Sequence, residues 1–106
     1  MAITNNSKEI TRGDTGLFSV TLYDQAGAEY IPSEGEIVRF YLLKKNCDDL
    51  DDALIVTDIP TDTMQLELTA SETNSLDVGT YQYRVRLIDT VGHEWTVIKS
   101  QLKIVC

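Results

Sequence analysis

The stretch LDVGTYQYRVRLIDTVGHEW, residues 76–95, decides the fold. Its side chains alternate with a period of two, which is typical of a strand with one buried face. The inward set is Tyr81, Tyr83, Val85 and Leu87, and the outward set is Gln82, Arg84 and Arg86. Gly79 permits a tight bend before this strand, and DTVGHE after it predicts a hairpin turn.

The same period continues along most of the chain. Strands are predicted near residues 8–12, 17–23, 37–43, 54–57, 64–68, 80–88 and 95–104, with turns at 24–27 and 58–62. In the last strand the parity of Trp95 and Val97 differs from that of Leu102 and Ile104, which predicts a β-bulge near 98–101. Thr69 or Ser71 can cap one short helical turn near 70–76.

About seven short strands in one domain, residues 1–106, predict an all-β fold, an immunoglobulin-like antiparallel β-sandwich. In such domains a tyrosine near the start of the sixth strand donates a hydrogen bond back across the preceding corner. Tyr81 has that position. Tyr83 then occupies the place of the second cysteine of an antibody domain, so packing alone must hold the two sheets together.

Composition excludes several functions. The chain has 106 residues with 17 acids and 9 bases, a formal charge of −8, which argues against nucleic acid as a partner. The start, MAITNNSKEI, lacks the pattern of a signal peptide, and no apolar run is long enough to span a membrane. We therefore expect a protein that is made and kept in a cytoplasm unless a larger particle carries it out, with Cys47 and Cys106 as free thiols.

The tripeptide Arg12-Gly13-Asp14 has two interpretations, an integrin-binding signal or a turn. It precedes the strand at 17–23, where the chain must cross to the opposite sheet. Gly13 can adopt a conformation closed to other residues, and the Asp14 side chain can accept hydrogen bonds from local amides. Integrin binding would also require export and a long exposed loop. The turn is the favoured interpretation.

No residue pattern predicts catalysis, a cofactor or a metal site, and we expect no enzyme activity. The acidic loop Asp48–Asp52 lacks the glycine and distant glutamate of an EF-hand. His93 is the only histidine and has no second ligand at metal-site spacing. Both are interpreted as surface features.

Three segments, RGDTGLFSVTLYDQAG, IVRFYLLKK and LDVGTYQYRVRLIDTVGHEW, together resemble immunoglobulin-like domains of tailed-phage structural proteins. The nearest similarity is to the N-terminal domain of phage baseplate upper proteins, over roughly residues 10–104. The resemblance implies a domain of a baseplate, tail or neck that joins virion components or contacts the host surface. It also implies a location in the virion, or in the host bacterial cytoplasm before assembly. A baseplate upper protein continues beyond the position of Cys106, so we expect a separate small virion protein or one domain of a longer one.

The outward parities of three strands predict an interface. They give Ile37, Arg39, Tyr41, Leu43, Arg84, Arg86, Ile88, Thr96 and Ile98 on one face. Arginine and tyrosine are enriched at interface centres, so the face is predicted to dock other virion proteins or a second copy of the chain, as a homo-oligomer. The alternative is that arginine stems simply cover the sheet. Sugar binding or bacterial cell-surface adhesion is the competing function, although Tyr81, Tyr83 and Trp95 are expected on the core side.

Overall fold

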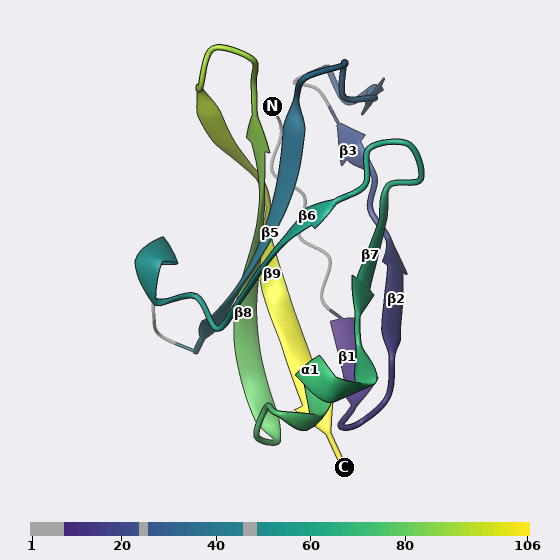
Figure 1. Cartoon of the computed structure of the whole chain (residues 1–106), viewed down its shortest axis with the longest axis vertical. Helices are drawn as coiled ribbons and strands as arrows, with labels where there is room; N and C mark the ends of the chain where they lie inside the picture. Colours follow the sequence, from purple (N-terminus) through teal and green to yellow (C-terminus); the bar gives the residue numbers. More distant parts are fainter. Residues whose placement is uncertain (1–7, 24–25, 46–48) are drawn as a thin grey trace.

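The computed structural model describes residues 8–23, 26–45 and 49–106, which form an all-β fold of nine strands with one short helix and one 3-10 turn (Figure 1). The largest sheet has five strands in the order β1, β9, β8, β5, β6. Their bounds are β1 Lys8–Thr11, β9 Glu94–Val105, β8 Gly79–Ile88, β5 Ile37–Lys44 and β6 Ile55–Ile59. All neighbours are antiparallel except β1 and β9, which are parallel, so the expectation of a wholly antiparallel fold is wrong at that edge.

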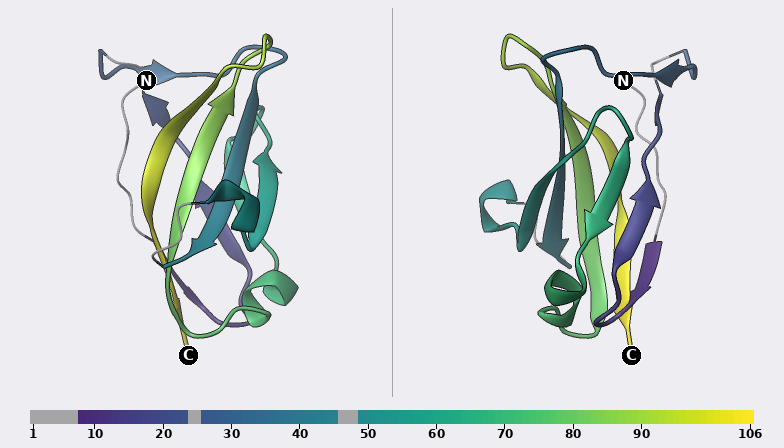
Figure 2. Two further views of the ribbon diagram at one scale, coloured as in Figure 1. Left: turned by 90° about the vertical axis from the view of Figure 1, so that its left-hand side faces the viewer. Right: turned by 45° about the vertical axis from the view of Figure 1, so that its right-hand side comes forward.

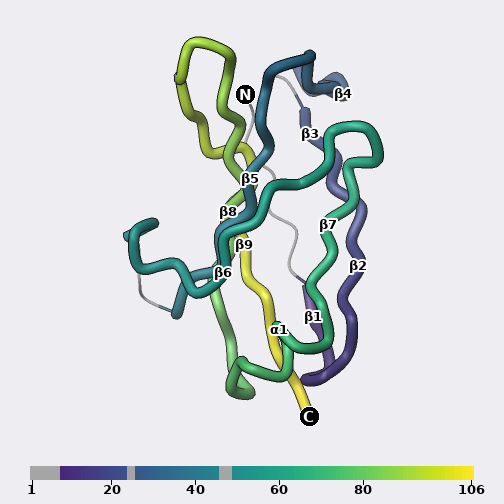
Figure 3. The backbone as a smooth tube through the Cα atoms, viewed as in Figure 1, coloured from purple at the N-terminus to yellow at the C-terminus, as the bar shows by residue number. Residues whose placement is uncertain are grey.

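Two small sheets complete the fold. Strand β2 (Gly16–Ser19) pairs with β7 (Gln65–Leu68), and β3 (Leu22–Tyr23) pairs with β4 (Glu29–Tyr30) at the end of the molecule opposite the C-terminus (Figure 3). The strand predicted at 17–23 is thus divided into β2 and β3. Met64 explains the division, because its φ of 51° takes the partner strand out of the extended conformation just before β7.

The β2–β7 sheet lies against one side of the five-stranded sheet (Figure 1). The side chains between these layers form the core. Those with less than 4% of their surface exposed include Val38, Phe40, Leu42, Leu66, Leu68, Tyr83, Val85 and Leu87. The rings of Phe40 and Tyr83, on the neighbouring strands β5 and β8, lie 5.6 Å apart between centroids and pack against each other within this core.

The predicted bulge is present, slightly earlier than expected. Val85 pairs with Ile98 and Arg86 pairs with Thr96, which leaves Val97 as the additional residue of β9. Val97 and Ile98 are both buried, and the parity of β9 changes there. Ile98 therefore faces the core, and its expected place on the outer surface is wrong.

Trp95 also departs from its expected burial, because 43% of its surface is exposed. It pairs with Leu87 on the core side of the sheet, but the β8–β9 hairpin extends beyond the ends of β2 and β7 (Figure 1). The prediction that Trp95 lies on the core side of its strand is correct, but the opposite sheet does not extend far enough to cover this side chain.

Helix α1 (Ala70–Asn74) lies in the predicted region, and its N-terminus has a complete capping box between Thr69 and Glu72. A second helical piece, the 3-10 turn η1 (Leu50–Asp52), was not predicted. It lies on the side of the five-stranded sheet that faces away from β2 and β7 (Figure 2). This placement determines the shape of the candidate site.

Candidate protein-interaction face

The outer face is the side of the five-stranded sheet that faces away from β2 and β7. Two rows of side chains cross it. The first contains Asp58, Arg39, Arg86 and Thr96, and the second contains Val56, Tyr41, Arg84 and Lys99. Strands β5, β8 and β9 thus belong to one sheet, as the sequence predicted, and bring three arginines together.

Arg39 and Arg86 lie directly opposite each other on neighbouring strands, which by itself is unfavourable for two like charges. Each has an acid beside it. Arg39 Nε donates to Asp58 Oδ1 at 2.7 Å, and this hydrogen bond raises the pKa of Arg39. Arg86 Nη1 lies 3.9 Å from Glu94 Oε2. Such half-exposed ion pairs add little stability, but they fix both guanidinium groups at the surface.

The interface predicted from the sequence needs three corrections. Tyr41 is only 9% exposed and Leu43 is fully buried, although both were expected at the surface. The turn η1 contacts β5 on this side, and Leu50 within it is half-buried. The third correction is Ile98, which faces the core. Ile37 is exposed, while Arg39, Arg84, Arg86 and Ile88 are half-buried on the outer face.

Sequence reasoning missed two exposed bases on the same face, Lys99 and Lys103. They pair with Arg84 and Thr80 across β8 and β9 and therefore point outward. A bulge placed at Val97 would have predicted Lys99, and the inward parity of Leu102 and Ile104 by itself predicts Lys103. In the described residues, the strands of the outer face carry five bases, Arg39, Arg84, Arg86, Lys99 and Lys103, and three acids, Glu9, Asp58 and Glu94. The strands alone therefore contribute +2 in a chain of −8, and the exposed acids Asp49, Asp51 and Asp52 of the loop over β5 bring the whole face to −1.

The acidic loop of the sequence rises from the outer face. Asp49 caps η1, because its carboxylate accepts a hydrogen bond from the Asp51 N–H at 3.0 Å. Asp49, Asp51 and Asp52 are exposed, and we call these three residues the acidic ridge. The ridge lies in front of β5 and β6, whereas β9 lies toward the other edge of the sheet (Figure 2). Asp48 and Cys47 lie outside the described residues, and Cys106 is an exposed free thiol.

The Arg12-Gly13-Asp14 tripeptide forms a turn that is attached to α1. Gly13 has a φ of 88°, and its N–H donates to Thr73 Oγ1 at 3.2 Å. The Thr73 hydroxyl donates to the Asp14 carbonyl at 2.7 Å, and Arg12 Nε donates to the Asn74 carbonyl. Within the described part of the chain, Asp14 uses its backbone here rather than its carboxylate, contrary to the prediction.

Thr73 is the residue of this turn that the sequence did not reveal. Its exposed fraction is 0%, and its hydroxyl joins two segments about sixty residues apart. A buried threonine in a polar stretch has no signal in the sequence, because its partners are backbone atoms.

Tyr81 makes the hydrogen bond predicted for it. Its hydroxyl donates to the Asp77 carbonyl at 2.7 Å across the corner that leads into β8. Gly79, between the two, has a φ of 155°, a value that favours glycine.

His93 lies in the β8–β9 turn and contacts Asp89. The Asp89 carboxylate accepts hydrogen bonds from the N–H groups of Val91 and His93, and its second oxygen lies 3.2 Å from His93 Nδ1. Desolvation raises the pKa of Asp89, but these interactions together outweigh it and lower the pKa below its ordinary value. Asp89 and His93 thus stabilise a turn, at a site with 70% of the His93 side chain exposed.

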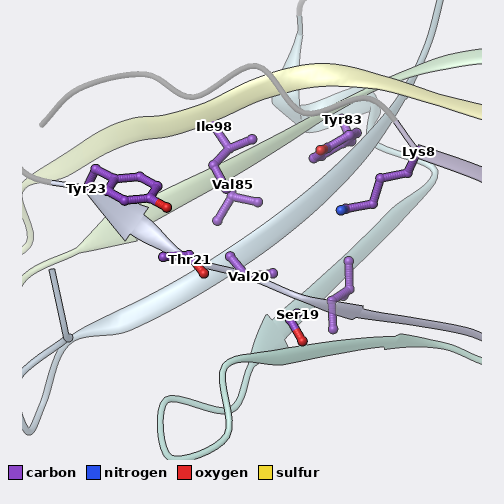
Figure 4. A pocket seen from close by; sticks show the side chains of 9 residues that line it. Lys8, Ser19, Val20, Thr21, Tyr23, Tyr83, Val85 and Ile98 are labelled. Atoms are coloured by element: carbon purple, nitrogen blue, oxygen red, sulfur yellow. The ribbon is translucent and has the colours of Figure 1, made fainter. Parts of the chain in front are cut away.

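A cavity of about 160 Å³ lies between the layers and is lined by Lys8, Ser19, Thr21, Tyr83 and Ile98, among others (Figure 4). The ammonium of Lys8 lies 4.9 Å from the centroid of the Phe18 ring. This lining mixes apolar side chains with hydroxyls and a single base. Among residues 8–23, 26–45 and 49–106, no cluster of histidine, cysteine or acidic side chains could hold a metal ion.

Within the same described ranges, no helix has the length and apolar character needed to cross a membrane. No protein-family model matches the chain, and no curated protein sequence matches it.

Proposed function

We propose that the chain is an immunoglobulin-like β-sandwich that acts as a non-enzymatic assembly domain of a phage or prophage particle, in its baseplate, tail or neck. The Tyr81–Asp77 hydrogen bond supports the immunoglobulin-like assignment. The division of strands supports it too, because β5, β8 and β9 share one sheet while β2 and β7 form the opposite one.

The charge of the outer face is the observation that carries the assembly role. Five bases gather on one surface of a strongly acidic chain, beside the exposed apolar side chains Ile37 and Val56. Basic side chains that cluster on one surface of an acidic chain, next to exposed aliphatic groups, are suited to binding an acidic protein surface. The partners are other virion proteins or a second copy of this chain.

Mass spectrometry of purified particles tests this function. The chain should be present at a fixed ratio to the other tail or baseplate components and should remain through repeated washing at low ionic strength. A chain found only in the cytoplasm of the producing cell would contradict a role in the virion.

Exposed aromatic side chains favour carbohydrate binding as the second candidate, with adhesion to a bacterial cell surface as its context. Trp95 is 43% exposed and makes an edge-on contact with His93, at 6.0 Å between ring centroids. A sugar ring can stack on such an indole. Saturable binding on a glycan array that is lost in Trp95→Ala would favour this candidate over assembly.

A further inference from the structure

The outer face contains both a projecting acidic element and an exposed basic one. The acidic ridge covers the β5 and β6 side, while Lys99 and Lys103 lie on β9 toward the other side (Figure 2). Symmetric dimers are built from one patch that complements itself, so that residue i contacts j and j contacts i. A face with acids on one side and bases on the other meets that requirement.

The register places these elements at the same height on the sheet. The ridge belongs to η1, which contacts β5, and Leu43 on the outer side of β5 is fully buried, so we place the ridge near the row of Leu43. This row continues through Gln82 to Gln101. Gln101 lies between Lys99 and Lys103, the two exposed bases of β9. A two-fold axis parallel to the strands exchanges the two sides of the face and preserves the height. It therefore brings the ridge of one copy opposite Lys99 and Lys103 of the other.

We propose that two copies of this chain associate face to face about such an axis, with the acidic ridge of each copy against β9 of the other. Each contact occurs twice. The proposal rests on the assembly function above and deepens it by naming the partner. It also gives a role to the exposed Asp51 and Asp52 side chains, and to Val56, which is 52% exposed on the outer face.

Complementary charge reversals test this arrangement. One variant carries Asp51→Lys and Asp52→Lys, and the other carries Lys99→Glu and Lys103→Glu. Each variant alone repels itself at both contacts and should associate at least about tenfold more weakly than the wild type. In a mixture, the lysines of the first variant meet the glutamates of the second, and the unchanged acids meet the unchanged bases. The mixture should form a dimer with one copy of each variant.

Sedimentation velocity from micromolar to millimolar concentration is the measurement, with native mass spectrometry to identify the composition of the dimer. The wild type should shift from 11.9 kDa towards twice that mass, and less so in high salt. Glu67→Lys, on the exposed side of β7, is a charge-reversal control away from the outer face and should dimerise like the wild type. Circular dichroism checks that each variant is folded.

Three results would overturn the proposal. They are a wild type that stays monomeric at millimolar concentration, reversal variants that still dimerise, and a mixture of folded variants that remains monomeric. None of these bears on whether the chain occurs in particles, so the proposed function would be judged separately by the particle analysis.

Discussion

The hydroxyl of Tyr81 donates a 2.7 Å hydrogen bond to the backbone carbonyl of Asp77. This bond closes the corner before β8, the central strand of the five-stranded sheet. Tyr81→Phe removes it and should lower the free energy of unfolding by about 0.5–1.5 kcal/mol. Urea denaturation measures the change. Tyr23→Phe, at an exposed tyrosine of β3, is the control and should have no effect. An unchanged denaturation midpoint for Tyr81→Phe would contradict a stabilising role for this hydrogen bond.

Thr73 holds the turn at residues 12–14 against α1. Thr73→Val keeps the shape of the side chain but leaves the Gly13 N–H and the Asp14 carbonyl without this partner. We expect a loss of about 1–3 kcal/mol in the free energy of unfolding. Thr11→Val, at an exposed position of β1, should change it little. Equal stabilities of the two variants would contradict the role of Thr73.

The same turn predicts the absence of integrin binding. Its backbone is occupied by hydrogen bonds to Thr73, and Arg12 is bound to the Asn74 carbonyl. In surface plasmon resonance, the wild type and Asp14→Glu should therefore give the same baseline response to an immobilised integrin. Saturable binding of the wild type that disappears in the variant would show that the tripeptide acts as a ligand.

Asp89 should make the stability of the hairpin depend on pH. Its pKa is lowered in the folded state, so its contribution is present above the unfolded value of about 3.9 and is lost as the pH falls through the lower folded value. The wild type should therefore exceed Asp89→Asn in stability most clearly at pH values above about 4. The difference should shrink at lower pH. Thermal unfolding of both proteins over this pH range measures the difference. A difference in stability that stays constant would contradict the role given to Asp89.

Much of the fold could be predicted because period-two alternation specifies which face of a strand is buried. Strand β8 was predicted within one residue of its observed bounds, and the roles of Gly79 and Tyr81 followed from its position. A single bulge limits this reasoning. The extra residue at Val97 reverses the parity of β9, which moves Ile98 into the core and Lys99 to the surface.

The candidate site was predicted less well, since alternation says nothing about what lies over a face. Tyr41 and Leu43 point outward from β5 but are covered on the side where η1 folds back. Trp95 is the opposite case, because its side chain points toward the core side but no strand of the opposite sheet covers it. A substitution at Tyr41 would therefore disturb packing, and the exposed pair Lys99 and Lys103 is the better choice for testing the face.

The central claim is that the outer face joins this chain to a protein partner in the particle. The most direct measurement is the amount of chain in purified particles when the producing cell supplies Lys99→Glu with Lys103→Glu, compared with Glu67→Lys at equal expression. The account predicts that the outer-face variant is depleted at least about tenfold while Glu67→Lys is incorporated like the wild type. Equal incorporation of both variants would contradict it.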